Sequence, residues 1–552
     1  MSIMRERAGC GAALEDSLAE AERALHAEGD LRSARHWFEA AYRDAECLRD
    51  GVTMARSALG MSGVWVHEHR TDAEAETIES RQRHALTLVH PRSSLALRLR
   101  ARLLGEQDYR AGRHAAILAM AGEARAHGDP VTLAETLSLA HHCLLGPDHV
   151  RLRKELSEEL IGQAAATGRR GDLLMGVMWR TVDLFLAGDP HAERSLHELR
   201  GLLRQGDHLA AGFVLSAIDV MLAIRAGRFD EAEDLAAVCV ERGTEAGDID
   251  ATGWYGGQIG AIRWYQGRIG ELLPVLSEMV GSATLSAVDH SYVAALAGAA
   301  AATGDRDLAE STLAKLGDLA ELPRSSTWLL TLFSVVEAAH LLGDRDLSAR
   351  AHALLLPFER LPMIASLGVV CFGSVRHALG MACLTMGDTA QAAAHLEAAV
   401  RDNLALGHWP AVALSRWRLG HALAQSHGPG HQGARKELAQ AMRDADDLGL
   451  PCPPRLPAPT SPVRPAVRDG SSPGAPGTAS SGGSSWAAGR CWSSRASACA
   501  TWPRCWPTRD ARSAPPSSPP TWSSRDRWTR RPDGPTGSGS PSSRRTSTSW
   551  PR

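Results

Sequence analysis

The sequence IRAGRFDEAEDLAAVCVERGTEAGD, residues 224–248, contains the end of one helix, a turn and a complete second helix. Gly227 makes the first turn, and a second turn follows at Gly247. Between the turns, aromatic and small residues recur at the spacing that places them on one helix face: Phe229, Ala232 and Ala236. The segment is therefore predicted to be half of a helical hairpin, with small side chains that let its helix lie close to a neighbour.

The same turn signal returns along the chain. Glycines followed by a charged residue and a renewed apolar period are Gly227, Gly267, Gly304, Gly343 and Gly387, which are 40, 37, 39 and 44 residues apart. The pattern Gly-x-aromatic-x-x-Ala-x-x-x-Ala resembles the second half of a tetratricopeptide repeat, whose period is about 34 residues. The resemblance implies an all-α fold, a tetratricopeptide-like α-solenoid of antiparallel helix hairpins. The longer period implies somewhat longer helices.

Helix signals extend over the whole of residues 1–450. Asp129-Pro130 and Asp189-Pro190 each combine a preferred N-cap residue with proline at the first helical position. No stretch alternates between apolar and polar residues at period two. Helical hairpins are therefore expected throughout this region, including residues 366–406 and 409–448.

The composition changes abruptly after Leu450. Residues 451–552 contain no Glu, Lys, Ile, Phe, Tyr, Met, His, Asn or Gln, but seven of the fifteen Trp of the chain. They carry 15 Arg and 4 Asp, a net charge of +11, so residues 1–450 carry −14 and the sum is −3. We expect a helical-repeat domain over 1–450 and a disordered tail rich in Ser, Pro, Arg and Trp over 451–552.

The tryptophan content of the tail is unusual for a disordered segment, and a frame change explains it. A shift by one base in a GC-rich gene turns codons for apolar residues into Trp, Cys and Ser codons. Regrouping allowed codons for residues 492–524 gives a patterned peptide containing RYLAEVLANPGREVSAPELA. We hypothesise that the frame changes after Leu450. Sequencing the gene and finding no restored frame with normal codon usage would contradict this hypothesis.

Cysteine usage and hydropathy indicate the compartment. The six cysteines before residue 451 are scattered singly, mostly in apolar helical stretches: Cys10, Cys47, Cys143, Cys239, Cys371 and Cys383. Such cysteines are typical of free thiols in a reducing compartment. The N-terminus lacks an apolar segment of signal-peptide length, and the longest apolar run, near residues 292–302, is too short to span a bilayer. We expect a cytoplasmic protein without a membrane partner.

Sequence patterns for nucleotide cofactors are not convincing. A phosphate-binding P-loop needs Lys after Gly, and the three lysines, Lys154, Lys315 and Lys436, follow other residues. Residues 253–260, GWYGGQIG, resemble a dinucleotide loop in letters only, because no strand precedes them. Glycines at this spacing more often permit close contact between helices. No cofactor is expected, and nothing in the sequence favours an enzyme.

Metal-binding patterns are also weak. The best candidate is residues 141–143, His-His-Cys, with Asp148 and His149 nearby, and the second is His67 with His69. Adjacent residues on a helix point in different directions, whereas zinc ligands converge. Packing is therefore the preferred interpretation, and no metal site is predicted. A metal-dependent hydrolase that uses His141 and Asp148 is a remote alternative.

A group of aromatic and basic residues is the candidate partner site. In such solenoids the first helix of each hairpin lines the concave face, and aromatic residues beside arginine anchor peptide partners. The residues predicted to bind a protein or peptide in this groove are Trp254, Tyr255, Arg263, Tyr265, Arg268 and Tyr292. The alternative is that these side chains belong to the core, as is expected for Trp264.

Residues 354–423 carry a more specific resemblance. The turn Gly387-Asp388, the run His395-Leu-Glu-Ala-Ala and Gly407-His-Trp-Pro resemble the tetratricopeptide-type region of large actinobacterial transcriptional regulators of the LuxR and antibiotic-regulatory types. In that family such regions are interaction modules beside an ATPase, which this chain lacks, and a DNA-binding domain. The resemblance implies a non-enzymatic scaffold that binds a protein or peptide in a transcription-regulatory pathway, with homo-oligomerisation possible.

The alternative function is a DNA-binding transcriptional regulator. The peptide regrouped from the tail resembles the helix, turn and helix of winged-helix regulators, so a DNA-binding module would lie in, or have been lost from, the C-terminal region. Nucleic acid is a partner only under this alternative. It requires that DNA affinity fall steeply with salt and disappear when the chain is cut after Leu450, which a filter-binding assay measures.

Overall fold

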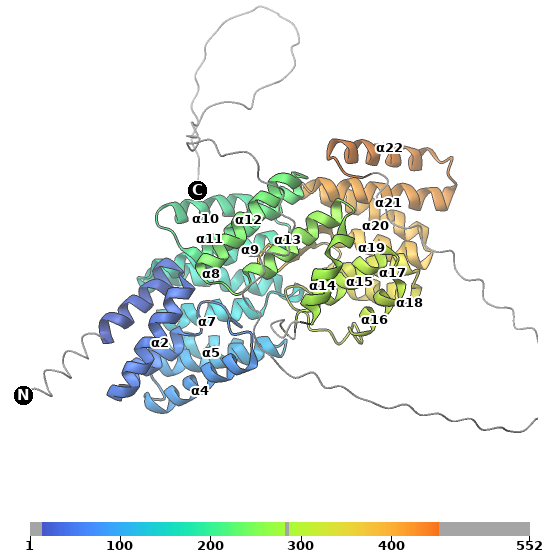
Figure 1. Ribbon diagram of the computed structural model, residues 1–552. Helices are drawn as coiled ribbons and strands as arrows, with labels where there is room; N and C mark the ends of the chain where they lie inside the picture. Colours follow the sequence, from blue (N-terminus) through green and yellow to red (C-terminus); the bar gives the residue numbers. More distant parts are fainter. Residues whose placement is uncertain (1–13, 282–285, 287, 452–552) are drawn as a thin grey trace, which may run out of the picture. The chain divides into compact units, whose positions relative to one another are not determined.

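The computed structural model describes residues 14–281, 286 and 288–451, which form helices paired with their sequence neighbours (Figure 1). The α-helices are α2 (Leu31–Leu48), α3 (Gly51–Gly60), α4 (Asp72–Leu88), α5 (Ser94–Arg110), α6 (Ala115–His127), α7 (Pro130–Cys143), α8 (Val150–Thr167), α9 (Arg170–Leu186), α10 (Ala192–Arg204), α11 (Leu209–Arg225), α12 (Phe229–Ala246), α13 (Ala251–Tyr265), α14 (Leu273–Val280), α15 (Ser291–Thr303), α16 (Arg306–Ala314), α17 (Trp328–Leu342), α18 (Arg345–Leu355), α19 (Val375–Met386), α20 (Thr389–Ala405), α21 (Trp409–His427) and α22 (Gln432–Asp447). Residues 14–23 are also helical, and shorter helical segments are η1 (Ala24–Glu28), η2 (Pro147–His149), η3 (Ile269–Leu272) and η4 (Leu356–Phe358).

The predicted all-α fold, a tetratricopeptide-like α-solenoid of antiparallel helix hairpins, is confirmed. The hypotheses of a disordered tail and of a frame change concern residues 452–552, which lie outside the described residues. The division of the chain into two domains at residue 450 stays a prediction.

The turn glycines have the conformation that the sequence predicts. Gly227, Gly267, Gly304, Gly343 and Gly387 all have φ between 67° and 87°, the left-handed region that disfavours residues with a Cβ atom. In the segment quoted first, α11 ends at Arg225 and the backbone N–H of Gly247 bonds the end of α12. Phe229, Ala232 and Ala236 are buried, as their spacing requires.

One segment corrects the expectation of continuous helix. Residues 366–374 do not start a helical hairpin, because β1 (Pro362–Ala365) pairs antiparallel with β2 (Val370–Ser374) and α19 begins only at Val375. Gly368 and Gly373 have φ of 88° and 89°, which no α-helix accommodates. Every strand residue is buried. The strands pack against α9, α11, α13 and α17, so this β-hairpin fills interior space of the solenoid.

Hydrogen bonds also join segments that lie 176 to 212 residues apart in sequence. Arg32 on α2 donates to the carbonyl oxygen of Thr244 at 2.5 Å, and the Trp65 indole Nε1 donates to Oδ2 of Asp248 at 2.9 Å. Further pairs of this kind are Arg35 with Gly247, Arg70 with Asp250 and Arg324 with Asp148. Segments far apart in the sequence therefore lie side by side in the helical domain.

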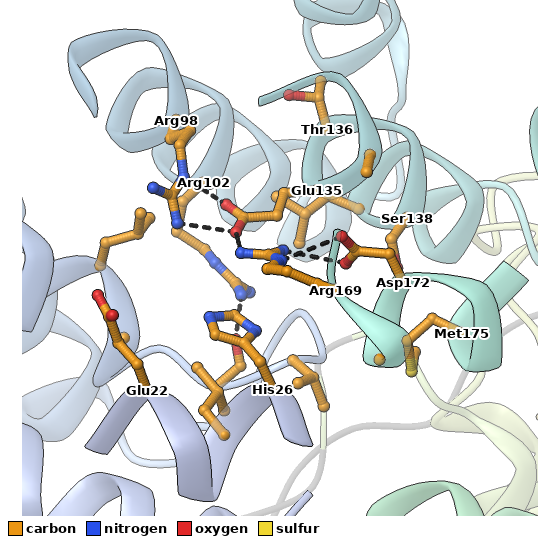
Figure 2. A pocket seen from close by; sticks show the side chains of 18 of the residues that line it. Glu22, His26, Arg98, Arg102, Glu135, Thr136, Ser138, Arg169, Asp172 and Met175 are labelled. Atoms are coloured by element: carbon orange, nitrogen blue, oxygen red, sulfur yellow. Dashed lines mark hydrogen bonds and ion pairs between the residues drawn. The ribbon is translucent and has the colours of Figure 1, made fainter. Parts of the chain in front are cut away.

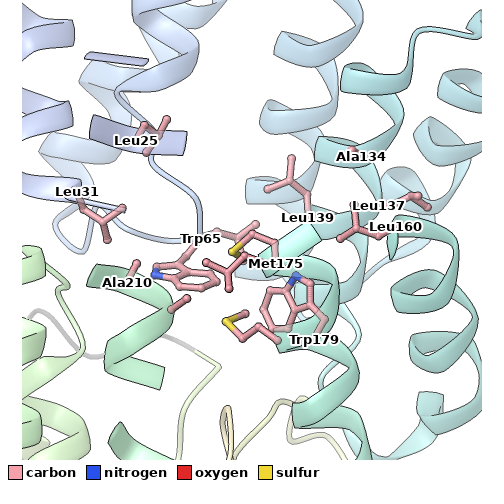
Figure 3. Packing of buried hydrophobic residues seen from close by; sticks show 14 of the residues in the cluster. Leu25, Leu31, Trp65, Ala134, Leu137, Leu139, Leu160, Met175, Trp179 and Ala210 are labelled. Carbon is pink, nitrogen blue, oxygen red and sulfur yellow. The ribbon is translucent and has the colours of Figure 1, made fainter. Parts of the chain in front are cut away.

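A large apolar core includes Trp65, one of the residues that make these long-range contacts (Figure 3). The rings of Trp65, which follows α3, and Trp179 on α9 meet edge to face with their centroids 5.7 Å apart. Leu25 and Leu31 from the N-terminal hairpin and Ala210 from α11 belong to the same buried cluster. Burying each large side chain contributes roughly 1.5–3 kcal/mol, so this cluster stabilises the packing of the N-terminal helices against α9 and α11.

The carboxyl group of Asp248 is buried beside the indole ring of Trp65. It accepts hydrogen bonds from Trp65 Nε1 and from the backbone N–H of Asp250, each at 2.9 Å. Burial, together with the negative charge of Asp250, raises the pKa of Asp248 to about 7. Because this native pKa lies above that of an unfolded chain, the folded state loses stability as the pH rises towards 7.

Asp248→Asn should remove this pH-dependent loss. The asparagine amide cannot ionise. It has one acceptor oxygen in place of two, so one of the two hydrogen bonds is lost, and this loss offsets part of the gain in stability at low pH. We expect the variant to be on the order of 2–3 kcal/mol more stable than the wild type at pH 8 and about equally stable at pH 5, measured by urea denaturation. Asp234→Asn, on the exposed face of α12, is the control. Equal pH dependence of wild type and Asp248→Asn would contradict the assignment.

Candidate partner-binding site

The predicted groove residues divide between the two ends of α13. At its first turn, Trp254 is half-buried and stacks on Phe213 of α11, with ring centroids 4.4 Å apart. The Tyr292 hydroxyl on α15 donates to the carbonyl oxygen of Gly253 at 2.8 Å. Tyr255 is half-buried, and burial raises its pKa. These contacts join α11, α13 and α15.

At the other end of α13, Tyr265 is only 8% exposed and contacts the interior β-hairpin. Its ring stacks on Phe372 of β2 at a centroid distance of 6.2 Å, and its hydroxyl lies 3.3 Å from Nε2 of His408. Burial raises the Tyr265 pKa well above its usual value, so the phenol remains protonated. Tyr265 is therefore held in place by contacts within the chain.

The two predicted arginines already have acidic partners. Arg263 donates to Glu233 of α12 at 3.2 Å. Arg268 is exposed and donates twice to Glu271, from Nε at 2.8 Å and from Nη2 at 2.9 Å. The hydrogen bond from Arg268 holds the pKa of Glu271 below its ordinary value. Arg268 and Glu271 thus form an accessible pair of opposite charges just after α13.

A cavity of about 320 Å³ lies beside this pair, and we call it the α13–α21 pocket. Its lining comes from the end of α13 and η3, from the end of α15, and from α21, α22 and residues 450–451. Aromatic and aliphatic walls are formed by Trp264, Tyr265, Leu414, Trp417 and Leu450, with small residues between them: Gly267, Gly270, Ala302, Ala413, Ala441 and Ala445. The pocket therefore offers an apolar interior with one charged pair, Arg268 and Glu271, among its lining residues.

The pocket unites two predicted residues with two that the sequence analysis did not assign to a site. Tyr265 and Arg268 line it, as do Trp264 and Trp417. The expectation that Trp264 is a core residue was incomplete, because its side chain is half-buried and lines the pocket as well as packing against Phe333. Trp417 lies 153 residues further along the chain, and no local pattern connects it with α13.

A second, smaller cavity of about 80 Å³ is lined by charged side chains (Figure 2). Arg98 donates to both oxygens of Glu135 at 2.6 and 2.7 Å, and Arg169 bridges Glu135 and Asp172. Burial alone would raise the pKa of Glu135, but the two guanidinium groups outweigh it and lower that pKa. These ion pairs satisfy one another, so the cavity is a structural network rather than a site with a free charge.

Three residues of the weak metal candidates have close partners within the chain. His141 is buried and its Nε2 lies 2.8 Å from Oδ2 of Asp183. Asp148 accepts from Nη1 of Arg324 at 2.6 Å. The Nε2 atom of His69 lies 3.1 Å from the carbonyl oxygen of Met61. These contacts favour a packing role for His141, Asp148 and His69.

Among the described helices, none combines the length and the apolar composition needed to cross a bilayer.

No family model matches the sequence, and no curated protein matches it. A crystal structure of the APC/C hetero-tetramer Cut9-Hcn1 is similar at 16% identity and a TM-score of 0.32, over 78% of this chain and 87% of that chain. A circular tandem repeat protein with novel repeat topology and enhanced subunit contact surfaces is similar at 13% identity and a TM-score of 0.11, over 79% and 96% of the two chains. Scores of this size carry no argument about function.

Proposed function

We propose that the chain is a non-enzymatic helical-repeat scaffold that binds an apolar segment of a protein or peptide in the α13–α21 pocket. The observation that carries the proposal is the lining of this pocket, in which Trp264, Tyr265 and Trp417 stand around small residues. Placement in a transcription-regulatory pathway rests on the resemblance of residues 354–423 to actinobacterial regulators.

The size of the pocket defines what it accepts. A volume of about 320 Å³ lies at the lower end of the range for ligand pockets and accommodates one or two large apolar side chains. Aromatic and leucine side chains are the anchors that release most binding energy in such a space. The charges of Arg268 and Glu271 compensate each other, so this pair does not favour either sign of charge on the partner. The partner is therefore proposed to carry an aromatic or leucine anchor.

The titratable groups of the pocket do not favour catalysis. Among its lining residues, Tyr265 has a pKa well above the usual value, and Glu271 has a lowered pKa because it accepts from Arg268. General acid and base catalysis at neutral pH works best with a group whose pKa lies near 7. The lining offers neither this nor an activated nucleophile, which supports a binding function.

Ala302→Phe should block the pocket without opening the core. Ala302 is a half-buried lining residue near the end of α15, and phenylalanine there would occupy the space of the partner's anchor. Peptides selected from a random library on the full chain should carry an apolar anchor and bind Ala302→Phe at least about tenfold more weakly, measured by fluorescence polarisation.

Ala424→Phe is the matched control, because Ala424 is a half-buried residue of α21 that does not line the pocket. Its affinity for the same peptides should equal that of the wild type. Selected peptides that lack apolar anchors, or that bind both variants equally well, would contradict the proposed site. Tagged full chain and Ala302→Phe should differ in the same way in the proteins that co-purify from the native host.

A further inference from the structure

Three metal-ligating side chains converge from three consecutive helices. His352 lies on α18, Cys383 on α19 and His395 on α20, and one ligand atom from each lies within 4.8 Å of the other two. The two imidazole rings meet edge to face with centroids 5.8 Å apart. Cys383 is fully buried, whereas both histidines are half-buried. The thiol therefore forms the base of the cluster, and the histidines stand between it and solvent.

The hydrogen bonding of the cluster is incomplete. His352 Nε2 is buried without a hydrogen-bond partner, and the Cys383 thiol donates a long hydrogen bond, of 4.0 Å, to Oε1 of Gln391. Among the described residues, His377 and His408 also have a buried nitrogen without a partner, but only the cluster of His352 brings three metal-ligating atoms within 4.8 Å of one another. A buried imidazole nitrogen without a partner is destabilising unless something binds to it.

The ligand types select the metal. One sulfur and two imidazole nitrogens are preferred by Zn²⁺, whereas Ca²⁺ and Mg²⁺ require oxygen ligands. Tetrahedral Zn²⁺ places such ligand atoms about 3.3–3.6 Å apart. Side-chain movements of about 1 Å would bring the three ligand atoms of the cluster to these distances. The carboxyl group of Asp388, the N-cap of α20, adds negative charge to the surroundings of all three ligands.

We propose that His352, Cys383 and His395 bind one Zn²⁺ ion, with water or the Gln391 side chain at the fourth position. This site is distinct from the α13–α21 pocket and independent of the proposed function. On binding, the thiol loses its proton to solvent and the sulfur forms a bond to the metal, while both histidines coordinate as neutral imidazoles. The ion would join α18, α19 and α20 at this point.

The protonation states in the absence of metal agree with this chemistry. Burial raises the pKa of the Cys383 thiol to about 11, so the thiol is protonated at neutral pH. Burial also lowers the pKa values of His352 and His395, which keeps both rings neutral and able to donate a lone pair. Each Zn²⁺ ion that binds should therefore release one proton, and its affinity should increase with pH.

The test uses the full chain, freed of metal with a chelator and titrated with Zn²⁺ and with Co²⁺. Calorimetry should show one tight site, and Co²⁺ should give a tetrahedral ligand-field spectrum with a thiolate charge-transfer band. Cys383→Ser should abolish this band, and His352→Gln and His395→Gln should each weaken Zn²⁺ binding at least about a hundredfold. The two histidines are half-buried, so these variants test the site even where Cys383→Ser disturbs folding.

Two controls separate this site from other ligands in the chain. Cys239→Ser removes a buried thiol on α12 and should leave the Co²⁺ spectrum unchanged. The double variant His427→Ala and His431→Ala removes a second histidine pair, whose ring centroids are 4.7 Å apart, and should leave the thiolate band intact. A thiolate band that persists in Cys383→Ser, or full Zn²⁺ affinity in either glutamine variant, would overturn the proposal.

Discussion

Asp183→Ala is expected to lower the free energy of unfolding by about 3–5 kcal/mol. Asp183 on α9 accepts from Arg153 Nε at 2.8 Å and from the Ser157 hydroxyl at 3.2 Å, and its other close partner is His141. Arg153 is only 1% exposed, so removing the carboxylate leaves a guanidinium charge buried without compensation. Urea denaturation of the wild type and the variant measures the loss.

The size of this effect depends on burial, and an exposed ion pair provides the comparison. Glu397 and Arg401 pair on the surface of α20, with side chains 67% and 62% exposed, and Glu397→Ala should change stability by less than about 1 kcal/mol. Asp183→Asn keeps the shape of the side chain but removes its charge. It should lower the free energy of unfolding by at least half as much as Asp183→Ala does. Equal tolerance of Asp183→Ala and Glu397→Ala would show that the network does not stabilise the fold.

Gly247→Ala is expected to have the second largest effect, a loss of about 3 kcal/mol. Gly247 has φ of 73°, and a Cβ atom there would lie 2.7 Å from the Cβ atom and 2.8 Å from the backbone nitrogen of Arg32. Because part of the obstacle is the backbone of Arg32, relief requires α2 to move away from the end of α12. Thermal or urea denaturation should show the loss.

Gly343→Ala isolates the conformational part of this effect. Gly343 has nearly the same φ of 72°, but no atom lies within 4 Å of the position that its Cβ atom would take. The cost there should be about 1 kcal/mol, the penalty for placing an L-residue in the left-handed region. If both substitutions lower the stability by the same amount, the close contact between Gly247 and Arg32 would be absent in solution.

The local pattern of the sequence was sufficient to predict the helices and turns. A glycine followed by an apolar period of 3.6 residues depends only on neighbours in the chain, and the five repeat glycines all adopt the predicted left-handed conformation. The β-hairpin at residues 362–374 could not be found in this way. Both of its strands are buried on two faces, and such strands form a continuous apolar run that periodicity does not distinguish from buried helix.

The candidate site was only partly predictable, for a physical reason. Tyr265 and Arg268 were identified because aromatic and basic residues cluster on and after α13. Trp417 lines the same pocket because the packing of successive hairpins brings α21 next to the ends of α13 and α15. The cluster of His352, Cys383 and His395 was missed because its members lie 31 and 12 residues apart on separate helices, without the short spacings of common zinc motifs.

The hydrogen bonds from Arg32 to Thr244 and from Trp65 to Asp248 also limit how early in translation the first hairpins can form all their native contacts. A ribosome adds residues from the N-terminus, so the first hairpins emerge long before residues 244–248 exist to cover them. Until then Trp65 and the leucines packed around it are only partly buried and expose an apolar surface to solvent and to chaperones. The nascent chain must therefore be roughly half finished before its beginning can reach the native state.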